Sequence, residues 1–343
     1  MMHNVTDRAH QDYTLHGVGV RVCWDDAVVA QHLQTLCMYF GLRVAPTVRA
    51  EQPVTFTLLT AAGCLAIPPG ALPVAEHAGV RAWRAAHLLY LSDGAVVMQL
   101  DPAAGTAMGT LRPGAENASK RVRKDLVLYS LLCLLRYRGL YALHAAGVAK
   151  DNVGVLLVAD SDSGKSTLAC SLVRQGWGYL SDDALLIRHC GDRLEALPLR
   201  REICLDLGAA RYFPDIVAHW YPCPLAQERK QRLNVEALWP EQVLTACQPR
   251  CLIFPRIVAA PVSQLRPVGK AEALLHLIRQ SAMLGLEPHL VPSHLDILKH
   301  LVHQTSRYQL FAGQDLGRNP TRITTLLADI LGQAWGSSLG GTA

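Results

Sequence analysis

The chain has 343 residues, of which half are hydrophobic, 18% are charged and 6% are aromatic. This composition excludes an intrinsically disordered protein, and the length is enough for two domains or for one domain with a large extension. The formal charge of +5 arises from 33 basic and 28 acidic residues spread along the chain, and the densest basic cluster, residues 120–124, is short. We therefore expect no nucleic-acid partner.

The cysteines and the apolar stretches indicate a cytoplasmic protein with no membrane partner. The ten cysteines form no CxxC pair and have no regular spacing, which is typical of reduced thiols. Cys247 and Cys251 have no second pair after them, so we expect core or loop cysteines rather than a zinc site. Residues 1–12 lack the apolar core of a signal peptide, and the longest apolar stretch, 126–135, is far shorter than the roughly 20 residues of a membrane span.

The first third of the chain predicts a β-rich α+β domain, which we place at residues 1–118. Short apolar runs alternate there with turn residues, and residues 27–40 have the apolar spacing of one helix. No catalytic motif lies in this part of the sequence. Substrate binding is our hypothesis for it. A second helix, predicted at 119–138, is apolar on nearly every side of its C-terminal half, so we expect it to be buried at the domain boundary.

The rest of the chain predicts an α/β domain with a mixed sheet, which we place at residues 119–335. Strands and helices alternate from residue 140, and a strand, a glycine-containing loop and a helix follow one another between 154 and 175. The predicted strands are 140–148, 154–159, 176–180, 251–254 and 257–259, with a hairpin of 184–188 and 194–199. The predicted helices are 166–175, 270–281, 292–302 and 321–333, before a Gly- and Ser-rich tail, 336–343, that we expect to be disordered.

The loop at residues 159–167 reads Ala-Asp-Ser-Asp-Ser-Gly-Lys-Ser-Thr and has the parts of a phosphate-binding loop. An apolar strand precedes it, Gly164 supplies a permissive backbone, Lys165 a cation for phosphate and Ser166 a hydroxyl for Mg²⁺. Ala159 stands where the pattern has glycine, and the carboxylate of Asp162 is repelled by phosphate unless it faces solvent or the metal. The alternative is a loop that only resembles a nucleotide site. The predicted nucleotide-binding residues are Asp160, Ser161, Asp162, Ser163, Gly164, Lys165, Ser166 and Thr167.

Two carboxylates, Asp182 and Asp183, follow Lys165 by 17 and 18 residues at the end of the next predicted strand. Sheet geometry places them beside the phosphate loop, where one can hold Mg²⁺ and the other can accept a proton from an attacking hydroxyl. The alternative is a solvated Asp pair in a turn. The sequence has no N-K-x-D motif, no D-x-x-G after the loop and no L-S-G-G-Q signature, which disfavours switch GTPases and transporter ATPases.

With His144, Gly164-Lys165-Ser166 and Ser181-Asp182-Asp183, the stretch 143–206 resembles the HPr kinase/phosphorylase family. The resemblance implies a compact P-loop domain related to phosphoenolpyruvate carboxykinase. It also implies dependence on ATP and Mg²⁺, phosphorylation of a serine hydroxyl on a protein, and a homo-oligomer. It further implies that His144 is the active-site histidine, Asp182 the general base and Asp183 a metal ligand, with Glu202 as a downstream acidic metal ligand. The alternative for His144 is a buried strand histidine satisfied by hydrogen bonds.

Residues 228–234, 252–257 and 270–274 are similar to an HPr-kinase-like subgroup found with ribosomally made peptides. That subgroup includes kinases that phosphorylate the C-terminal serine of lasso-peptide precursors. Lys230, Arg232 and Arg256 become candidates for contacting the transferred phosphate or an acidic peptide end, with a solvated basic turn as the alternative. The leading hypothesis is an ATP- and Mg²⁺-dependent kinase acting on a Ser or Thr hydroxyl of a peptide or small protein. A small-molecule kinase and a non-catalytic nucleotide sensor or scaffold are the alternatives.

Overall fold

The computed structural model describes residues 9–46, 53–60, 65–111, 124–151, 153–222, 230–281, 284–319 and 321–336. The chain divides into two compact units, the first made of Met1–Tyr141 with Met283–His289 and the second of Ala142–Ala282 with Leu290–Ala343. Except for Gly336 and Lys124, the tail predicted at 336–343 and the basic cluster at 120–124 lie outside the described residues.

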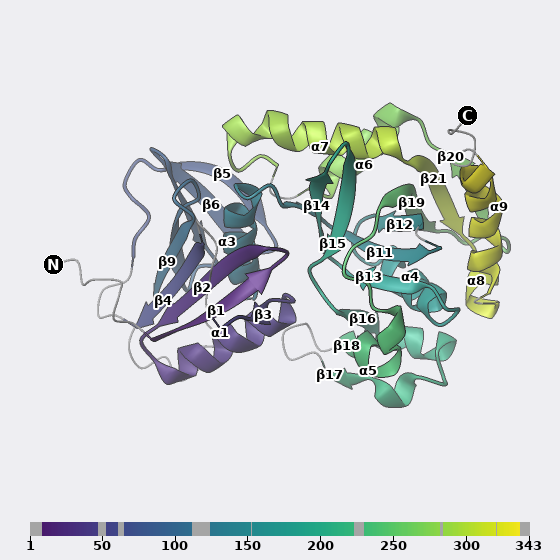
Figure 1. Cartoon of the computed structure of the whole chain (residues 1–343), viewed down its shortest axis with the longest axis horizontal. Helices are drawn as coiled ribbons and strands as arrows, with labels where there is room; N and C mark the ends of the chain where they lie inside the picture. Colours follow the sequence, from purple (N-terminus) through teal and green to yellow (C-terminus); the bar gives the residue numbers. More distant parts are fainter. Residues whose placement is uncertain are drawn as a thin grey trace. The chain divides into compact units, whose positions relative to one another are not determined.

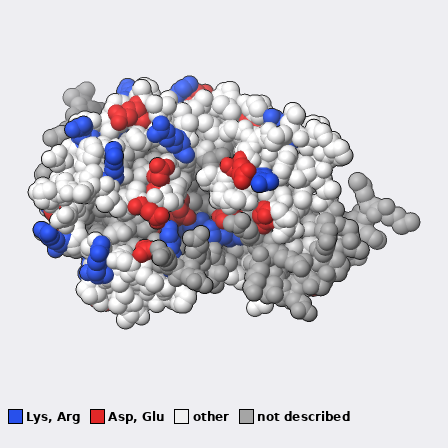
Figure 2. All heavy atoms as spheres, turned by 180° about the vertical axis from the view of Figure 1, so that it is seen from behind, with Lys and Arg blue, Asp and Glu red and all other residues white. Residues whose placement is uncertain are grey.

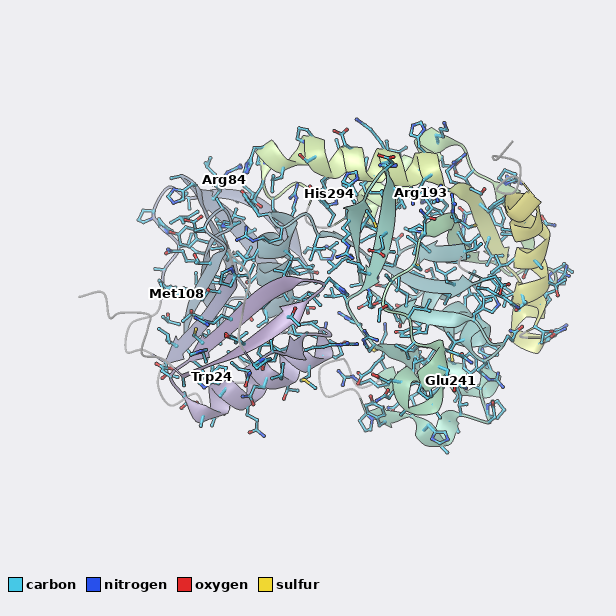
Figure 3. The ribbon with its side chains drawn as sticks, viewed as in Figure 1. Trp24, Arg84, Met108, Arg193, Glu241 and His294 are labelled. Carbon is cyan, nitrogen blue, oxygen red and sulfur yellow. The ribbon has the colours of Figure 1, made fainter. Side chains whose placement is uncertain are left out.

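The first unit is built on a nine-stranded sheet in the order β3-β1-β2-β4-β9-β8-β7-β6-β5 (Figure 1). β5 to β9 form an antiparallel meander, while β2, β4 and β9 run parallel to one another. Residues alternate across the sheet, since Ala107 is buried and Met108, labelled in Figure 3, is 38% exposed. The strands are β1 (Ala9–Leu15), β2 (Val18–Trp24), β3 (Arg43–Val44), β4 (Val54–Thr60), β5 (Leu72–His77), β6 (Val80–Ala85), β7 (Leu88–Ser92), β8 (Val97–Asp101) and β9 (Thr106–Leu111).

Two helices belong to the first unit. The helix predicted at 27–40 is present as α1 (Ala27–Tyr39), and the Asp26 side chain caps it by accepting hydrogen bonds from two backbone N–H groups. The second, α3 (Lys124–Arg136), packs on β4, β7, β8 and β9. The sequence predicts this helix as part of the second domain, whereas it belongs to the first unit, which extends to Tyr141. The difference arises because the buried leucines of α3 pack on the sheet of the first unit.

The second unit contains the predicted mixed sheet, with six strands in the order β13-β11-β12-β19-β21-β20 (Figure 1). β12, β19 and β21 are parallel, and the other pairs are antiparallel. The two strands predicted at 251–254 and 257–259 are one continuous strand, because Pro255 and Arg256 remain paired with β21. The strands are β11 (Ala145–Lys150), β12 (Val153–Val158), β13 (Gly178–Ser181), β19 (Pro249–Ile257), β20 (Gln264–Pro267) and β21 (Ser306–Ala312).

Helices cover both faces of this sheet. α4 (Lys165–Val173) and α9 (Arg322–Gly336) pack on one face, where Val155, Leu157 and Leu172 lie in one continuous core. On the other face, His276 of α6 (Lys270–Arg279) stacks on the ring of Phe254, with centroids 4.6 Å apart, and α7 (Val291–Gln304) packs on α6. The smaller elements are β10 (Tyr141–Leu143), the predicted hairpin of β14 (Leu185–Cys190) and β15 (Arg193–Pro198), a three-stranded sheet of β16 (Glu202–Asp206), β17 (Tyr221–Pro222) and β18 (Lys230–Asn234), and the short helices α5 (Val235–Leu238) and α8 (Gln314–Arg318). No helix in the described ranges is long and apolar enough to cross a membrane.

Gly154 marks the close approach of two backbones at the start of β12, the strand that leads to the phosphate loop. A Cβ at this position would lie 2.5 Å from the carbonyl oxygen of Gln248 and 2.8 Å from the sulfur of Cys247. We expect Gly154→Ala to lower the free energy of unfolding by about 1–3 kcal/mol, measured by urea denaturation, because backbone atoms have to shift. Gly285→Ala is the control, since nothing lies within 4 Å of an added Cβ there. Equal unfolding midpoints for the two variants would contradict this expectation.

Candidate functional site

The phosphate loop connects the end of β12 to the start of α4, so the predicted order of strand, loop and helix is present. Gly164 has a φ of 90°, a left-handed conformation that glycine adopts without strain, and it caps α4 without offering a side-chain acceptor. The first N–H groups of a helix have no partner within the helix, and the helix dipole adds positive potential there. The loop therefore ends at a helix terminus suited to an anion.

Lys165 lies inside the loop. Its side chain is buried, and Nζ donates hydrogen bonds to the carbonyl oxygens of Ala159 at 2.7 Å and Asp160 at 2.8 Å. Burial lowers the pKa of Lys165, whereas the nearby Asp182, Asp183 and Asp160 act to raise it. Phosphate oxygens are stronger acceptors than neutral carbonyls because they carry charge. The ammonium group is thus placed so that its hydrogen bonds to these carbonyl oxygens can be replaced by hydrogen bonds to a phosphate.

Ser163 provides a test of whether a phosphate group fits this loop. Its Oγ atom is buried and has no hydrogen-bond partner among the described residues. A buried hydroxyl without a partner costs about 1–3 kcal/mol, so such an atom is usually satisfied by something that binds. Together with the open N-terminus of α4 and the Lys165 ammonium, the hydroxyl fits a bound phosphate.

The two departures from the glycine pattern have different structural explanations. Ala159 keeps a negative φ, so its position does not require glycine. Asp162 has a φ of 61°, which glycine would adopt more easily, but Asp tolerates this region better than most residues. The side chain of Asp162 is 85% exposed, and its Oδ1 atom lies 3.7 Å from Nζ of Lys230. Its carboxylate therefore faces solvent and a lysine.

Asp182 lies directly beside the phosphate loop and is 1% exposed. Its Oδ1 atom accepts a hydrogen bond from the Ser166 hydroxyl at 3.0 Å, and its Oδ2 atom accepts one from the backbone N–H of Cys204 at 3.1 Å. Burial, and then the neighbouring Asp183, raise the pKa of Asp182, while the two hydrogen bonds and Arg200 oppose that rise. A carboxylate with a raised pKa holds a transferred proton more readily than an ordinary one.

Asp183 faces a different set of groups. One carboxylate oxygen lies 3.1 Å from Nε2 of His144, and the other pairs with the buried guanidinium of Arg200. Asp183 has a φ of 66°, and the N–H of Ala184 donates to the Asp182 carbonyl at 2.8 Å to close the turn. Because of this left-handed turn, the adjacent carboxylates of Asp182 and Asp183 contact different groups. His144 is half-buried between β10 and β11, and its ring lies beside Asp183.

Ser181, which the sequence-based reasoning did not single out for a role, holds this turn in place. It is fully buried, and its Oγ atom lies 2.6 Å from the carbonyl oxygen of Ala184 and 2.9 Å from that of Arg200. The same atom accepts a hydrogen bond from the N–H of Arg200 at 2.9 Å. The hydroxyl thus connects the turn that carries both carboxylates to the segment between β15 and β16 that carries Arg200.

Glu202, a predicted metal ligand, has two partners in the structure. Its carboxylate accepts a hydrogen bond from the Tyr221 hydroxyl at 2.6 Å and pairs with Arg232 at 3.1 Å across the β16–β18 ladder. Ser166, another of the three predicted metal ligands, donates a hydrogen bond to Asp182. Within the described part of the chain, no three His, Cys, Asp or Glu side chains gather in a way that could hold a metal ion.

The three basic candidates have different surroundings. Lys230 reaches the phosphate loop at Asp162, and Arg256 is exposed near the end of β19. Arg232 is 7% exposed and is paired with Glu202, so it is an internal cation rather than the solvated basic turn of the alternative. Ile257, the residue after Arg256, is 62% exposed and lies close to Gly164 of the loop.

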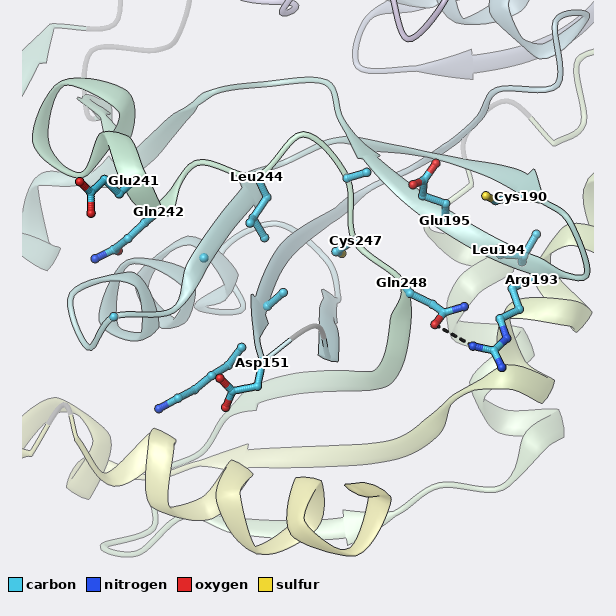
Figure 4. A pocket seen from close by; sticks show the side chains of 15 residues that line it. Asp151, Cys190, Arg193, Leu194, Glu195, Glu241, Gln242, Leu244, Cys247 and Gln248 are labelled. Atoms are coloured by element: carbon cyan, nitrogen blue, oxygen red, sulfur yellow. Dashed lines mark hydrogen bonds between the residues drawn. The ribbon is translucent and has the colours of Figure 1, made fainter. Parts of the chain in front are cut away.

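A pocket of about 630 Å³ lies elsewhere in the second unit (Figure 4). Its lining includes Lys150 and Asp151 at the end of β11, together with Arg193 and Glu241, which are also labelled in Figure 3. Lys150 pairs with the first residue of β12, whereas the phosphate loop follows the last one. The pocket is therefore at the opposite end of the strands from the phosphate loop.

Comparison with models of protein families gives no match, and no curated protein matches the chain. Among solved structures, the chain is similar to the Hpr(Ser) kinase/phosphatase from Coxiella burnetii, with a TM-score of 0.30 and 13% sequence identity. This likeness covers 56% of the present chain and 97% of that chain. The assignment of a function therefore rests on the geometry of the site itself.

Substitutions at Asp162 separate its backbone conformation from its charge. Asp162→Gly and Asp162→Ala both remove the carboxylate, but only glycine adopts a φ near 61° without strain. We expect Asp162→Ala to be less stable than Asp162→Gly by about 1 kcal/mol in urea denaturation. Both variants should bind ATP a few-fold more tightly than the unmodified chain in calorimetry, because one negative charge near the phosphates is gone. Equal stability of the two variants would show that the left-handed position carries no strain.

Removal of the Ser181 hydroxyl tests the turn. Ser181→Ala leaves the backbone groups of Ala184 and Arg200 without this partner in a buried place. We expect the free energy of unfolding to fall by about 1–3 kcal/mol. Ser293→Ala, at an exposed position of α7, is the matched control and should change it by at most about 0.5 kcal/mol. The turn hypothesis fails if the two variants unfold at the same urea concentration.

Proposed function

We propose that this chain is an ATP- and Mg²⁺-dependent kinase that phosphorylates a Ser or Thr hydroxyl of a peptide or small protein. The observation that carries the proposal is the buried contact between Ser166 of the phosphate loop and Asp182, at 3.0 Å. It joins a predicted phosphate- and metal-binding hydroxyl to a carboxylate whose pKa is raised. A phosphate loop alone supports nucleotide binding, whereas the added carboxylate supports transfer to a hydroxyl.

The roles follow from what each group can donate or accept. The Lys165 ammonium, the Ser163 hydroxyl and the N-terminus of α4 would hold the phosphates. Mg²⁺ would neutralise phosphate charge, and Ser166 and Asp183 would supply oxygen ligands of the kind that it prefers. Asp182 would accept the proton of the attacking hydroxyl, and His144 with Arg200 would hold Asp183 in place.

A peptide acceptor is supported by the charges near the loop. Lys230 reaches Asp162, and Arg256 is exposed near the end of β19, so both can meet an acidic group such as a peptide C-terminus. Figure 2 shows Lys and Arg mixed with Asp and Glu on the face that it presents, rather than the continuous basic field that binds a nucleic-acid backbone. The C-terminal serine of a lasso-type precursor peptide is the specific acceptor that we propose, and the first unit is our candidate for binding it.

Asp182→Asn tests the assignment of the base. The amide oxygen can still accept the hydrogen bond of the Cys204 N–H, and the NH₂ group can donate to the Ser166 hydroxyl oxygen, but the amide cannot take up the proton. We expect ATP affinity in calorimetry to stay nearly unchanged while phosphate transfer falls by about 10² to 10⁴. Transfer is measured by intact mass after incubation with ATP, Mg²⁺ and pools of candidate peptides or metabolites, which also separates a peptide kinase from a small-molecule kinase.

Asp192→Asn, in the exposed turn of the β14–β15 hairpin, is the matched control and should leave transfer unchanged. Transfer by Asp182→Asn at the rate of the unmodified chain would remove Asp182 from the role of base. Binding of ATP without transfer to any acceptor would favour the nucleotide sensor, and no binding would favour a scaffold.

A further inference from the structure

Gln280 joins two parts of the site that are far apart in the sequence. It is the C-terminal cap of α6 and is 8% exposed. Its Nε2 atom donates to Oδ1 of Asp160 at 2.6 Å, and its Oε1 atom lies 2.8 Å from Nδ1 of His144. Its backbone carbonyl also accepts a hydrogen bond from the N–H of His144 at 3.0 Å. The end of α6 therefore holds both the backbone and the ring of His144.

The chemistry of these contacts fixes which way the amide points. An ionised Asp160 carboxylate accepts hydrogen bonds only, so it requires the NH₂ end of the Gln280 amide. The carbonyl end must then face His144, and Nδ1 of the ring has to carry the hydrogen to complete the contact. Nε2 of the ring then lies 3.1 Å from an oxygen of Asp183, and it donates a hydrogen bond there only when the ring carries a hydrogen on both nitrogens.

We propose that Gln280 is a positioning residue that fixes the orientation of the His144 ring and keeps a hydrogen on its Nδ1 atom. It thereby links the start of the phosphate loop to Asp183 through one run of contacts, Asp160 to Gln280 to His144 to Asp183. Asp160 is also one of the two residues whose carbonyl accepts from Lys165, so the run begins at the phosphate-binding lysine. The proposal deepens the function proposed above, since it concerns the same site, but its structural part holds whatever the acceptor is.

The residue type matters for this role. A glutamate would keep an acceptor for Nδ1 but could not donate to Asp160, and a leucine of similar size would remove both contacts. A shorter asparagine would not span the gap between Asp160 and His144 from the end of α6. Glutamine supplies one donor and one acceptor at a fixed separation, which matches a carboxylate on one side and a ring N–H on the other.

The test combines a ring measurement with kinetics on the full-length chain. Nitrogen-15 NMR distinguishes a protonated ring nitrogen from a bare one, and comparison with His144→Gln identifies the His144 signals. We expect Nδ1 of His144 to carry the hydrogen in the unmodified chain and to lose this preference in Gln280→Leu. In the same variant, kcat for phosphate transfer should fall by about 10- to 100-fold while the Kd for ATP changes by less than about threefold.

Gln304→Leu is the matched control. Gln304 ends α7 as Gln280 ends α6, but its amide bonds only to the backbone of Leu194 and Pro249, away from the loop. This variant should lose stability and keep both the His144 signals and kcat. The proposal is wrong if Gln280→Leu leaves the His144 signals unchanged, or if the two variants lower kcat equally.

Gln280→Glu provides a second test of the proposal if the leucine variant does not fold. Its carboxylate still accepts from the ring, so the hydrogen should stay on Nδ1 of His144, and loss of that hydrogen would overturn the proposal. If the unmodified chain transfers no phosphate, the proposed kinase function fails. The NMR comparison would still decide whether Gln280 fixes the ring of His144.

Discussion

The burial of the Asp182 carboxylate next to a phosphate-binding loop is the constraint on which the site depends. A buried charge costs several kcal/mol unless hydrogen bonds and nearby cations compensate for it. Here the Ser166 hydroxyl comes from the loop, the N–H of Cys204 from β16, and the guanidinium of Arg200 from the segment before it. Three separate segments must therefore be in register before this carboxylate is satisfied. That requirement couples the folding of the second unit to the geometry of its site.

Two non-glycine residues with left-handed backbone, Asp162 and Asp183, lie at this site. Such conformations cost free energy and persist where the surrounding structure determines them. Asp183 is held by Ser181 from within the turn and by His144 and Arg200 through its carboxylate. Asp162 has only a distant lysine beside an exposed side chain. Several contacts thus hold the acidic turn in place, whereas Asp162 of the phosphate loop is held by fewer contacts.

Local patterns were enough to predict the strand, the loop and the helix around Lys165, because hydrophobic period and one glycine specify them. The position of Asp182 beside the loop also followed, since neighbouring strands end at the same edge of a sheet. The partners from distant segments could not be predicted. Gln280 is 120 residues from Asp160 and 136 from His144, and nothing near it in the sequence marks a polar role. The pairing of Glu202 with Arg232 could not be predicted either, because it depends on how β16 and β18 align.

The charged groups around Lys165 indicate that a phosphate could bind without a rearrangement of the site. Asp160, Asp182 and Asp183 act to raise the pKa of the Lys165 ammonium, and Lys230 acts to lower it. These three acids already have hydrogen bonds or cationic partners, so Lys165, the helix N-terminus and the Ser163 hydroxyl are the donors that a bound phosphate would meet. Because Lys165 now bonds to neutral carbonyls only, the exchange would cost little. The network around Asp183 would keep its form, which is what a preorganised transfer site requires.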